Sequence, residues 1–175
     1  MQYIAFLRGI NVGGRTIKMA ELKSCFEGVG FRNVQTVLQT GNVIFESAEY
    51  SEDDLSSQIE SLLSNTFNYP AKILVLKPER LAQILDQNPL GALNGYHQYV
   101  VFTKNGFQTE IIAGCGSLDA ETESVEAGSN VVYWRVKKGL TLDSVFGKYM
   151  AKAANQEFMT ARNVNTLNKI LAKTK

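Results

Sequence analysis

The sequence is poor in the side chains that most often carry catalysis or bind metals. It contains two cysteines and a single histidine among its 175 residues. Cys25 and Cys115 show no CxxC spacing, which favours two reduced thiols over a disulfide or a metal site. His97 has no second histidine and no cysteine nearby, so it predicts neither a metal site nor a nucleophilic triad. We expect no metal, no cofactor and no identifiable catalytic residue. An enzyme that uses His97 or a pair of carboxylates as a base stays an open alternative.

The chain also lacks a dominant charge and a long apolar run. Lysine and arginine number 18 against 17 aspartates and glutamates, so the net charge of +1 gives no overall attraction to nucleic acid or membranes. No stretch approaches the roughly 18 apolar residues of a membrane span, and we recognise no signal segment. The 45% hydrophobic and 20% charged residues are ordinary for a globular protein. We therefore expect a cytoplasmic protein that does not engage membranes.

The first half of the chain alternates short apolar strands with amphipathic helices. We expect one helix to begin at Met19 and a second at Ser51, with Asp54 completing a capping-box-like arrangement. Thr40 and Gly41 predict a tight hairpin turn. Strands are expected at residues 2–7, 33–39, 43–46 and 71–76. This βαββαβ order is typical of a ferredoxin-like antiparallel sheet with both helices on one face.

The second half repeats the start of this order. Pro78 is expected to begin a third helix, which Asn88 and Pro89 end at a domain boundary. A strand, a helix and two strands then follow at residues 96–104, 108–113, 123–126 and 131–137, and two helices at 142–154 and 164–172. The sequence thus predicts an α+β fold of two ferredoxin-like halves with antiparallel sheets, the second half incomplete and followed by C-terminal helices. The expected domains are residues 1–77 and 96–175, joined by a linker helix and turn over 78–95.

A glycine-rich loop between the first strand and the first helix is the leading candidate site. Its three glycines would let backbone N–H groups approach an anion, and two arginines flank them. The spacing matches neither a Walker loop nor the dinucleotide-binding fingerprint. A turn that serves backbone geometry alone is the competing interpretation. The candidate ligand-binding residues of this loop are Arg8, Gly9, Asn11, Gly13, Gly14 and Arg15.

Polar residues elsewhere in the chain extend this candidate site. Gln39 precedes the expected hairpin turn, where it would face a ligand or solvent. In the polar segment 160–166, Asn163 is expected to cap the last helix. Arg162 beside a helix N-terminus is unfavourable unless an anion or a carboxylate neutralises it, so a salt bridge competes with ligand binding there. We add Gln39, Thr160, Arg162 and Asn163 to the candidate ligand-binding residues.

A local basic cluster offers a different hypothesis. Aromatic residues are interleaved with it, and exposed aromatics beside basic side chains can stack on single-stranded RNA. Strand alternation, however, places Trp134 with Val136 on one face and predicts that Trp134 is buried. Nucleic-acid binding is therefore the less favoured interpretation. The cluster consists of Arg135, Lys137, Lys138, Lys148 and Lys152, with Tyr133, Trp134 and Tyr149 between them.

Three motifs together resemble a bacterial protein family. They are Phe6-Leu7-Arg8-Gly9-Ile10-Asn11-Val12-Gly13-Gly14 with Met19-Ala20-Glu21-Leu22, the hairpin Gln39-Thr40-Gly41-Asn42-Val43-Ile44-Phe45, and Thr160-Ala161-Arg162-Asn163-Val164-Asn165-Thr166-Leu167. The chain resembles the family called domain of unknown function 1697. The resemblance implies a compact α/β protein of two ferredoxin-like halves and implies no activity. The chain departs from its relatives at Val164, where they often carry an aromatic residue.

These features favour a non-catalytic module that binds a small anionic or phosphorylated ligand. Arg8 and Arg15 would supply charge, and the backbone of the glycine-rich loop would supply N–H donors. Arg162 and Asn163 would complete the site if the C-terminal segment folds back against that loop. The alternatives are a module that binds nucleic acid or another protein, and an enzyme of unassigned class. Self-association of the chain stays open.

Overall fold

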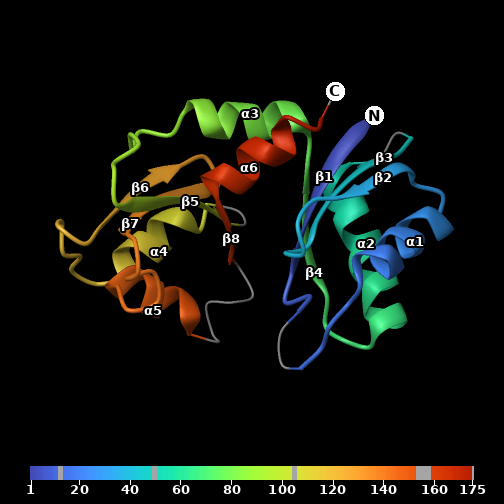
Figure 1. Cartoon of the computed structure of the whole chain (residues 1–175), viewed down its shortest axis with the longest axis horizontal. Coiled ribbons are helices and arrows are strands. Elements are labelled where there is room, and N and C mark those ends of the chain that lie inside the picture. Colours follow the sequence, from blue (N-terminus) through green and yellow to red (C-terminus); the bar gives the residue numbers. More distant parts are fainter. Residues whose placement is uncertain (12–13, 49–50, 104–105, 153–158, 175) are drawn as a thin grey trace. The chain divides into compact units, whose positions relative to one another are not determined.

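A computed structural model describes residues 1–11, 14–48, 51–103, 106–152 and 159–174 (Figure 1). The chain divides into two compact units, which we describe separately. The first unit comprises Met1–Leu81 with Ile170–Lys175, and the second comprises Ala82–Lys169. None of the helices in the described residues is long and apolar enough to cross a membrane.

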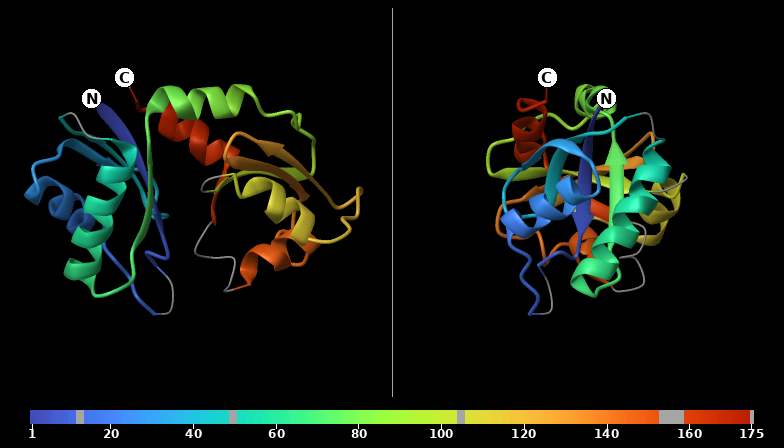
Figure 2. Two further views of the ribbon diagram at one scale, coloured as in Figure 1. Left: turned by 180° about the vertical axis from the view of Figure 1, so that it is seen from behind. Right: turned by 90° about the vertical axis from the view of Figure 1, so that its right-hand side faces the viewer.

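The first unit contains a four-stranded antiparallel sheet. Its strand order is β2-β3-β1-β4, and every neighbouring pair of strands is antiparallel. The helices α1 and α2 lie on the same face of this sheet (Figures 1 and 2). The elements are β1 (Gln2–Arg8), α1 (Met19–Gly28), β2 (Arg32–Thr36), β3 (Asn42–Glu46), α2 (Glu52–Phe67) and β4 (Lys72–Leu76), and α3 (Pro78–Asp86) follows them. This connectivity is compatible with a ferredoxin-like arrangement.

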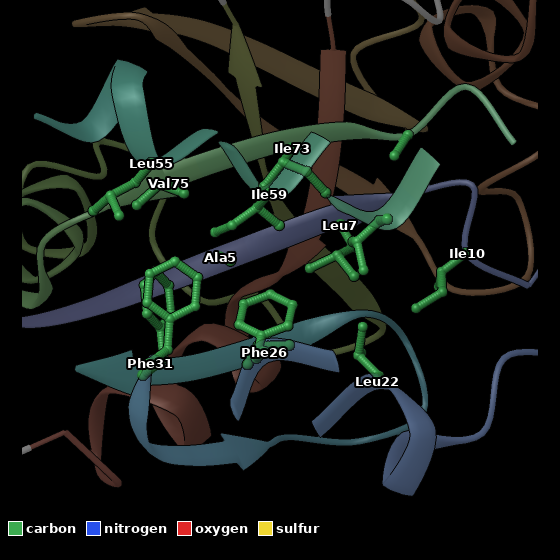
Figure 3. Packing of buried hydrophobic residues seen from close by; sticks show 14 of the residues in the cluster. Ala5, Leu7, Ile10, Leu22, Phe26, Phe31, Leu55, Ile59, Ile73 and Val75 are labelled. Atoms are coloured by element: carbon green, nitrogen blue, oxygen red, sulfur yellow. The ribbon is translucent and has the colours of Figure 1, made fainter. Parts of the chain in front are cut away.

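The core of the first unit lies between the sheet and its two helices. Alternate residues of β1 point into it, so Ala5 and Leu7 meet apolar side chains from α1 and α2 (Figure 3). Phe26 of α1 is fully buried, and its ring packs edge-on to Phe45 of β3 with the ring centroids 5.5 Å apart. Leu55 of α2 is also fully buried. The helical spacing of these apolar residues is what fixes which face of each helix meets the sheet.

Local sequence signals set the helix starts in this unit. The Ser51 hydroxyl accepts a hydrogen bond of 3.1 Å from the backbone N–H of Asp54, as expected for the cap of α2. The helix α1 begins at Met19, also as expected, but Lys18 at its N-cap position provides no side-chain hydrogen bond. The first turn of α1 therefore keeps backbone N–H groups that no capping side chain satisfies.

The second unit contains a second four-stranded antiparallel sheet. Its strand order, β6-β7-β5-β8, repeats that of the first sheet when the strands of each unit are numbered along the chain. The helices α4 and α5 lie on one face of it (Figure 2). The elements are β5 (Tyr96–Thr103), α4 (Gln108–Gly114), β6 (Glu123–Gly128), β7 (Val131–Lys137), α5 (Val145–Ala151) and β8 (Met159–Asn163), and α6 (Val164–Leu171) follows them. An α+β fold with two antiparallel sheets is thereby confirmed.

The expectation of an incomplete second half is wrong, because β8 supplies the fourth strand. β8 pairs antiparallel with β5, with Met159 opposite Thr103 and Asn163 opposite Tyr99. The strand is short and mostly polar, so no apolar alternation marks it in the sequence. The helix expected from residue 142 begins at Val145, where the Ser144 hydroxyl accepts the N–H of Gly147. The expected last residues of that helix, 153 and 154, lie outside the described part of the chain.

Each unit ties the end of its first strand to the turn between its second and third strands. The N–H of Leu7, next to the end of β1, donates to the carbonyl of Gly41 at 2.7 Å. The N–H of Thr103, at the end of β5, donates to the carbonyl of Asn130 at 2.9 Å. The recurrence of this hydrogen bond at corresponding positions supports the internal repeat that the order of elements suggests.

Candidate functional site

The glycine-rich loop between β1 and α1 has a backbone path that requires glycine. Gly9 has φ of 65° and Gly14 has φ of 81°, a conformation that L side chains rarely adopt. Gly13, the third glycine of the candidate site, lies outside the described residues. The two described glycines therefore have a conformational role whether or not the loop binds a ligand.

Asn11 braces this loop against its neighbours. Its Nδ2 donates to the carbonyl of Gln39 at 3.1 Å, and its Oδ1 accepts the N–H of Ile17 at 2.9 Å. One side chain thus connects the loop to the β2–β3 hairpin and to the segment that leads into α1. Both polar atoms of Asn11 are used inside the protein, which gives this candidate ligand-binding residue a structural role.

The β2–β3 hairpin differs from the expected tight turn. β2 ends at Thr36 and β3 begins at Asn42, and the N–H of Val37 closes the loop by donating to the carbonyl of Asn42 at 2.8 Å. The buried Asn42 side chain donates to the carbonyl of Val37 and to the hydroxyl of Thr40, both at 2.9 Å. These side-chain bonds support a longer loop, so the hairpin is present but its turn is not the tight one predicted from Thr40 and Gly41.

Close packing holds the hairpin loop against the glycine-rich loop. A Cβ atom at Gly41 would lie 3.0 Å from Cγ2 of Ile10 and 3.0 Å from Cβ of Leu7. Gly41 also has a positive φ of 72°. The side chain of Gln39 is exposed on this loop, while its carbonyl holds Asn11.

Arg15 is positioned by an aromatic ring. The guanidinium carbon of Arg15 lies 4.5 Å from the centroid of the Tyr69 ring, within the range of a cation–π contact. No acidic side chain of the described residues lies within ion-pairing distance of Arg15. The Tyr69 side chain is 6% exposed, and its hydroxyl has no hydrogen-bond partner among the described residues. Burial raises the pKa of the Tyr69 phenol, and the Arg15 charge partly opposes that rise.

The two arginines that flank the glycines, Arg8 and Arg15, have different surroundings. Leu7 belongs to the core beneath α1 and α2, so the side chain of Arg8 points to the other face. Arg8 lies opposite Lys72 of β4 in the register, which places two basic side chains together on that face. Tyr69, whose ring the Arg15 guanidinium contacts, belongs to the core beneath the helices. The described part of the candidate site therefore centres on Arg15.

The C-terminal candidates lie in the second unit. Thr160, Arg162 and Asn163 belong to β8, and the Nη1 of Arg162 donates to the hydroxyl of Thr160 at 2.9 Å and to the carbonyl of Ala161 at 2.8 Å. The Oδ1 of Asn163 accepts the N–H of Asn165 at 2.9 Å, which confirms the predicted cap of the last helix. The sequence does not predict that this segment is a strand, because its extended conformation depends on pairing with β5.

Two of the three aromatic residues of the basic cluster are buried. Trp134 is buried in the core of the second unit, as strand alternation predicts, and Tyr133 is buried as well. The Tyr133 hydroxyl donates to the carbonyl of Ile84 at 2.8 Å. Arg135 donates to the carbonyl of Gly91 at 3.2 Å and lies 5.9 Å from the Tyr96 ring. The faces of Tyr133 and Trp134 are therefore unavailable to nucleic-acid bases.

One known protein family matches most of this chain. The family described as "Protein of unknown function (DUF1697)" matches residues 1–133. The chain belongs to this family. The match covers the glycine-rich loop and the β2–β3 hairpin, and it confirms the resemblance seen in the sequence motifs. The DUF1697 match ends before β8, so the candidates on that strand lie beyond it.

The fold of this DUF1697 protein is shared with a solved structure. That structure is described as the conserved bacterial protein SP0830 from Streptococcus pneumoniae. The two proteins are 24% identical with a TM-score of 0.79, and the similarity covers 98% of this chain and 97% of the other. At this identity the likeness concerns the fold alone. No curated protein matches the chain.

Proposed function

We propose that this protein is a non-catalytic binding module for a small anionic or phosphorylated ligand, held at the loop between β1 and α1. The proposal rests on the surroundings of the Arg15 side chain. Its guanidinium is stacked on the nearly buried Tyr69 ring, and it has no acidic partner among the described residues. A guanidinium that no described carboxylate neutralises can offer planar, paired N–H donors to a phosphate or carboxylate.

The braced loop supports this proposal. Asn11 joins the loop to Gln39 and Ile17, and Gly41 packs directly against Leu7 and Ile10. Residues that the protein already holds in place lose little entropy when they bind a ligand. The start of α1 adds backbone N–H groups without a capping side chain, and these groups favour negative charge.

The remaining candidates extend the proposed site. Gln39 would add an exposed amide. Arg8, which lies opposite Lys72, would add a positive charge if its side chain reaches around the end of β1. Thr160, Arg162 and Asn163 would contribute if the C-terminal segment meets the loop. Hydrogen bonds within β8 and α6 already engage Nη1 of Arg162, the Thr160 hydroxyl and Oδ1 of Asn163.

A thermal-shift experiment on the full chain tests the proposal. Inorganic phosphate, pyrophosphate and a set of phosphorylated metabolites are each added in excess, with sodium chloride at matched ionic strength as the reference. An anion that binds only the folded protein raises the melting temperature by mass action. We expect the Arg15→Met variant to lose the anion-induced rise. Arg32→Met is the matched control, because Arg32 is an exposed arginine on β2 of the same unit, and it should keep the rise.

Further variants separate the parts of the site. Arg15→Lys keeps the charge but loses the planar donor pair, so we expect an intermediate anion-induced rise. Arg8→Ala and Arg162→Ala test whether these residues contribute at all. If no anion in the set stabilises the protein beyond sodium chloride, or if Arg15→Met keeps the full rise, the proposed function is wrong.

A further inference from the structure

The second unit contains a cavity of about 230 Å³ that the proposed function does not use. It lies where β5 begins, next to the residue after β7 and the junction between β8 and α6. Residues from four separate segments line it, including His97, Gln98, Lys138, Asn163 and Asn165. The volume is below the roughly 300–1,000 Å³ typical of pockets for drug-sized ligands, so only a small molecule fits it.

Three side chains at this cavity, those of His97, Lys138 and Asn163, carry N–H groups that donate to no described residue. Lys138 forms no ion pair with any described residue, and the His97 ring lies edge-on to the Tyr99 ring with the ring centroids 6.2 Å apart. The Oδ1 of Asn163 is occupied by the N–H of Asn165, while the Asn163 amide group donates to no described residue. None of the described residues that line the cavity is acidic. An anion satisfies these donors better than a neutral or cationic ligand does.

Apolar residues form another part of the lining. Ala92, Leu93 and Val164 lie at the cavity, and the Leu93 side chain is 47% exposed. A ligand that covers them has a short hydrocarbon part beside its charged group. Among the described residues of the lining, Lys138 alone is permanently charged, which matches a single negative charge on the ligand.

We propose that this cavity binds the carboxylate of a small aliphatic acid. The ammonium group of Lys138 and the N–H groups of His97 and Asn163 hold the carboxylate, and Leu93 and Val164 contact the hydrocarbon part. This site does not depend on Arg15 or on the glycine-rich loop. It adds a second ligand-binding site, in the second unit, to the one proposed above.

The single histidine of the chain provides a direct probe of this site. His97 is the only histidine in the sequence, so its imidazole C–H signals stand alone in the proton NMR spectrum of the full chain. The titration uses sodium butyrate, with butyramide as a neutral compound of similar shape, at constant pH and ionic strength. We expect butyrate to shift the His97 signals with saturation and butyramide to leave them nearly unchanged.

Two neighbouring lysines provide the matched variants. Lys138→Gln should weaken butyrate binding by about tenfold or more, because it removes the charged donor. Lys137→Gln should bind like the parent protein, because Lys137 is also exposed but does not line the cavity. The absence of a saturable butyrate shift would overturn the proposal. Equal shifts with butyramide, or unchanged butyrate binding in Lys138→Gln, would overturn it too. The comparison of butyrate with butyramide uses the parent protein, so it holds even if a variant fails to fold.

Discussion

The carboxylate of Glu123 accepts a hydrogen bond of 3.0 Å from the indole N–H of Trp134 in the core of the second unit. Its other oxygen accepts the backbone N–H of Phe146, in the first turn of α5, also at 3.0 Å. Glu123 is 2% exposed, so both oxygens are engaged away from water. One buried side chain therefore links β6, β7 and the start of α5.

Replacing this carboxylate should destabilise the second unit. In Glu123→Gln one acceptor oxygen becomes an NH2 group that faces an N–H donor, so we expect a loss of about 1–3 kcal/mol in the free energy of unfolding. Urea unfolding followed by Trp134 fluorescence measures it, since Trp134 is the single tryptophan. Glu126→Gln is the control on the same strand, and because Glu126 is exposed it should change stability by less than about 0.5 kcal/mol. Similar losses in both variants would contradict the buried role of Glu123.

Gly41 should tolerate alanine less well than a glycine in open space. Gly41→Ala adds a Cβ in contact with Leu7 and Ile10 and also strains a backbone with φ of 72°. We expect a loss of about 2–4 kcal/mol in unfolding free energy. Gly30→Ala isolates the backbone part, because Gly30 has φ of 91° and a Cβ added there would meet no atom within 4 Å, and it should cost about 1–2 kcal/mol. Equal losses, measured by urea unfolding, would show that the contact with the glycine-rich loop adds nothing.

Asn11→Ala should loosen the glycine-rich loop. The variant loses the hydrogen bonds to the carbonyl of Gln39 and from the N–H of Ile17. Because the Ile17 amide loses its acceptor, we expect its hydrogen exchange, measured by NMR, to become at least about tenfold faster. Thr16→Ala changes a neighbouring side chain that neither of these hydrogen bonds involves, and it should leave that rate close to its original value. An unchanged exchange rate of the Ile17 amide in Asn11→Ala would show that Asn11 does not hold the loop in place.

Tyr69 should make the protein less stable in alkali. Burial raises the pKa of its phenol in the folded protein, so the unfolded chain releases the proton first as the pH rises. Stability from this group is therefore full below about pH 10, the ordinary tyrosine value, and is lost as the pH rises toward the folded pKa. Tyr69→Phe removes this loss. We expect the difference in urea midpoint between about pH 8 and about pH 10.5 to be smaller in Tyr69→Phe than in the parent protein.

A tyrosine with a different environment provides the comparison for this prediction. Burial raises the pKa of Tyr133 as well, so part of the alkaline loss should persist in Tyr69→Phe. At neutral pH the two phenylalanine variants should differ. Tyr133→Phe loses the hydrogen bond to Ile84 and should be destabilised, whereas Tyr69→Phe removes a hydroxyl without a described partner and should keep or gain stability. An alkaline loss unchanged in Tyr69→Phe would contradict the assignment to Tyr69.

Much of the element order follows from local patterns in the sequence. The cap at Ser51 and the cap at Asn163 depend on atoms within three residues of each other, so they are visible in the chain itself. Strand alternation predicts that Trp134 is buried, which the structure confirms, but it does not predict that Tyr133 on the opposite face is buried too. The prediction of a tight turn at Thr40 and Gly41 is wrong because Asn42 stabilises a longer loop through side-chain bonds to Val37 and Thr40, which a turn-residue rule does not include.

The sequence by itself determined the two α+β halves, the family and the position of the glycine-rich loop, because periodicity, caps and motifs are local properties. Only the tertiary structure decided that β8 is a strand, since its polar residues acquire that conformation by pairing with β5. It also decided that Arg15 rests on Tyr69 and that Lys138 and His97 line one cavity. These residues are far apart in the chain, and contacts across such separations form only when sheets and helices pack.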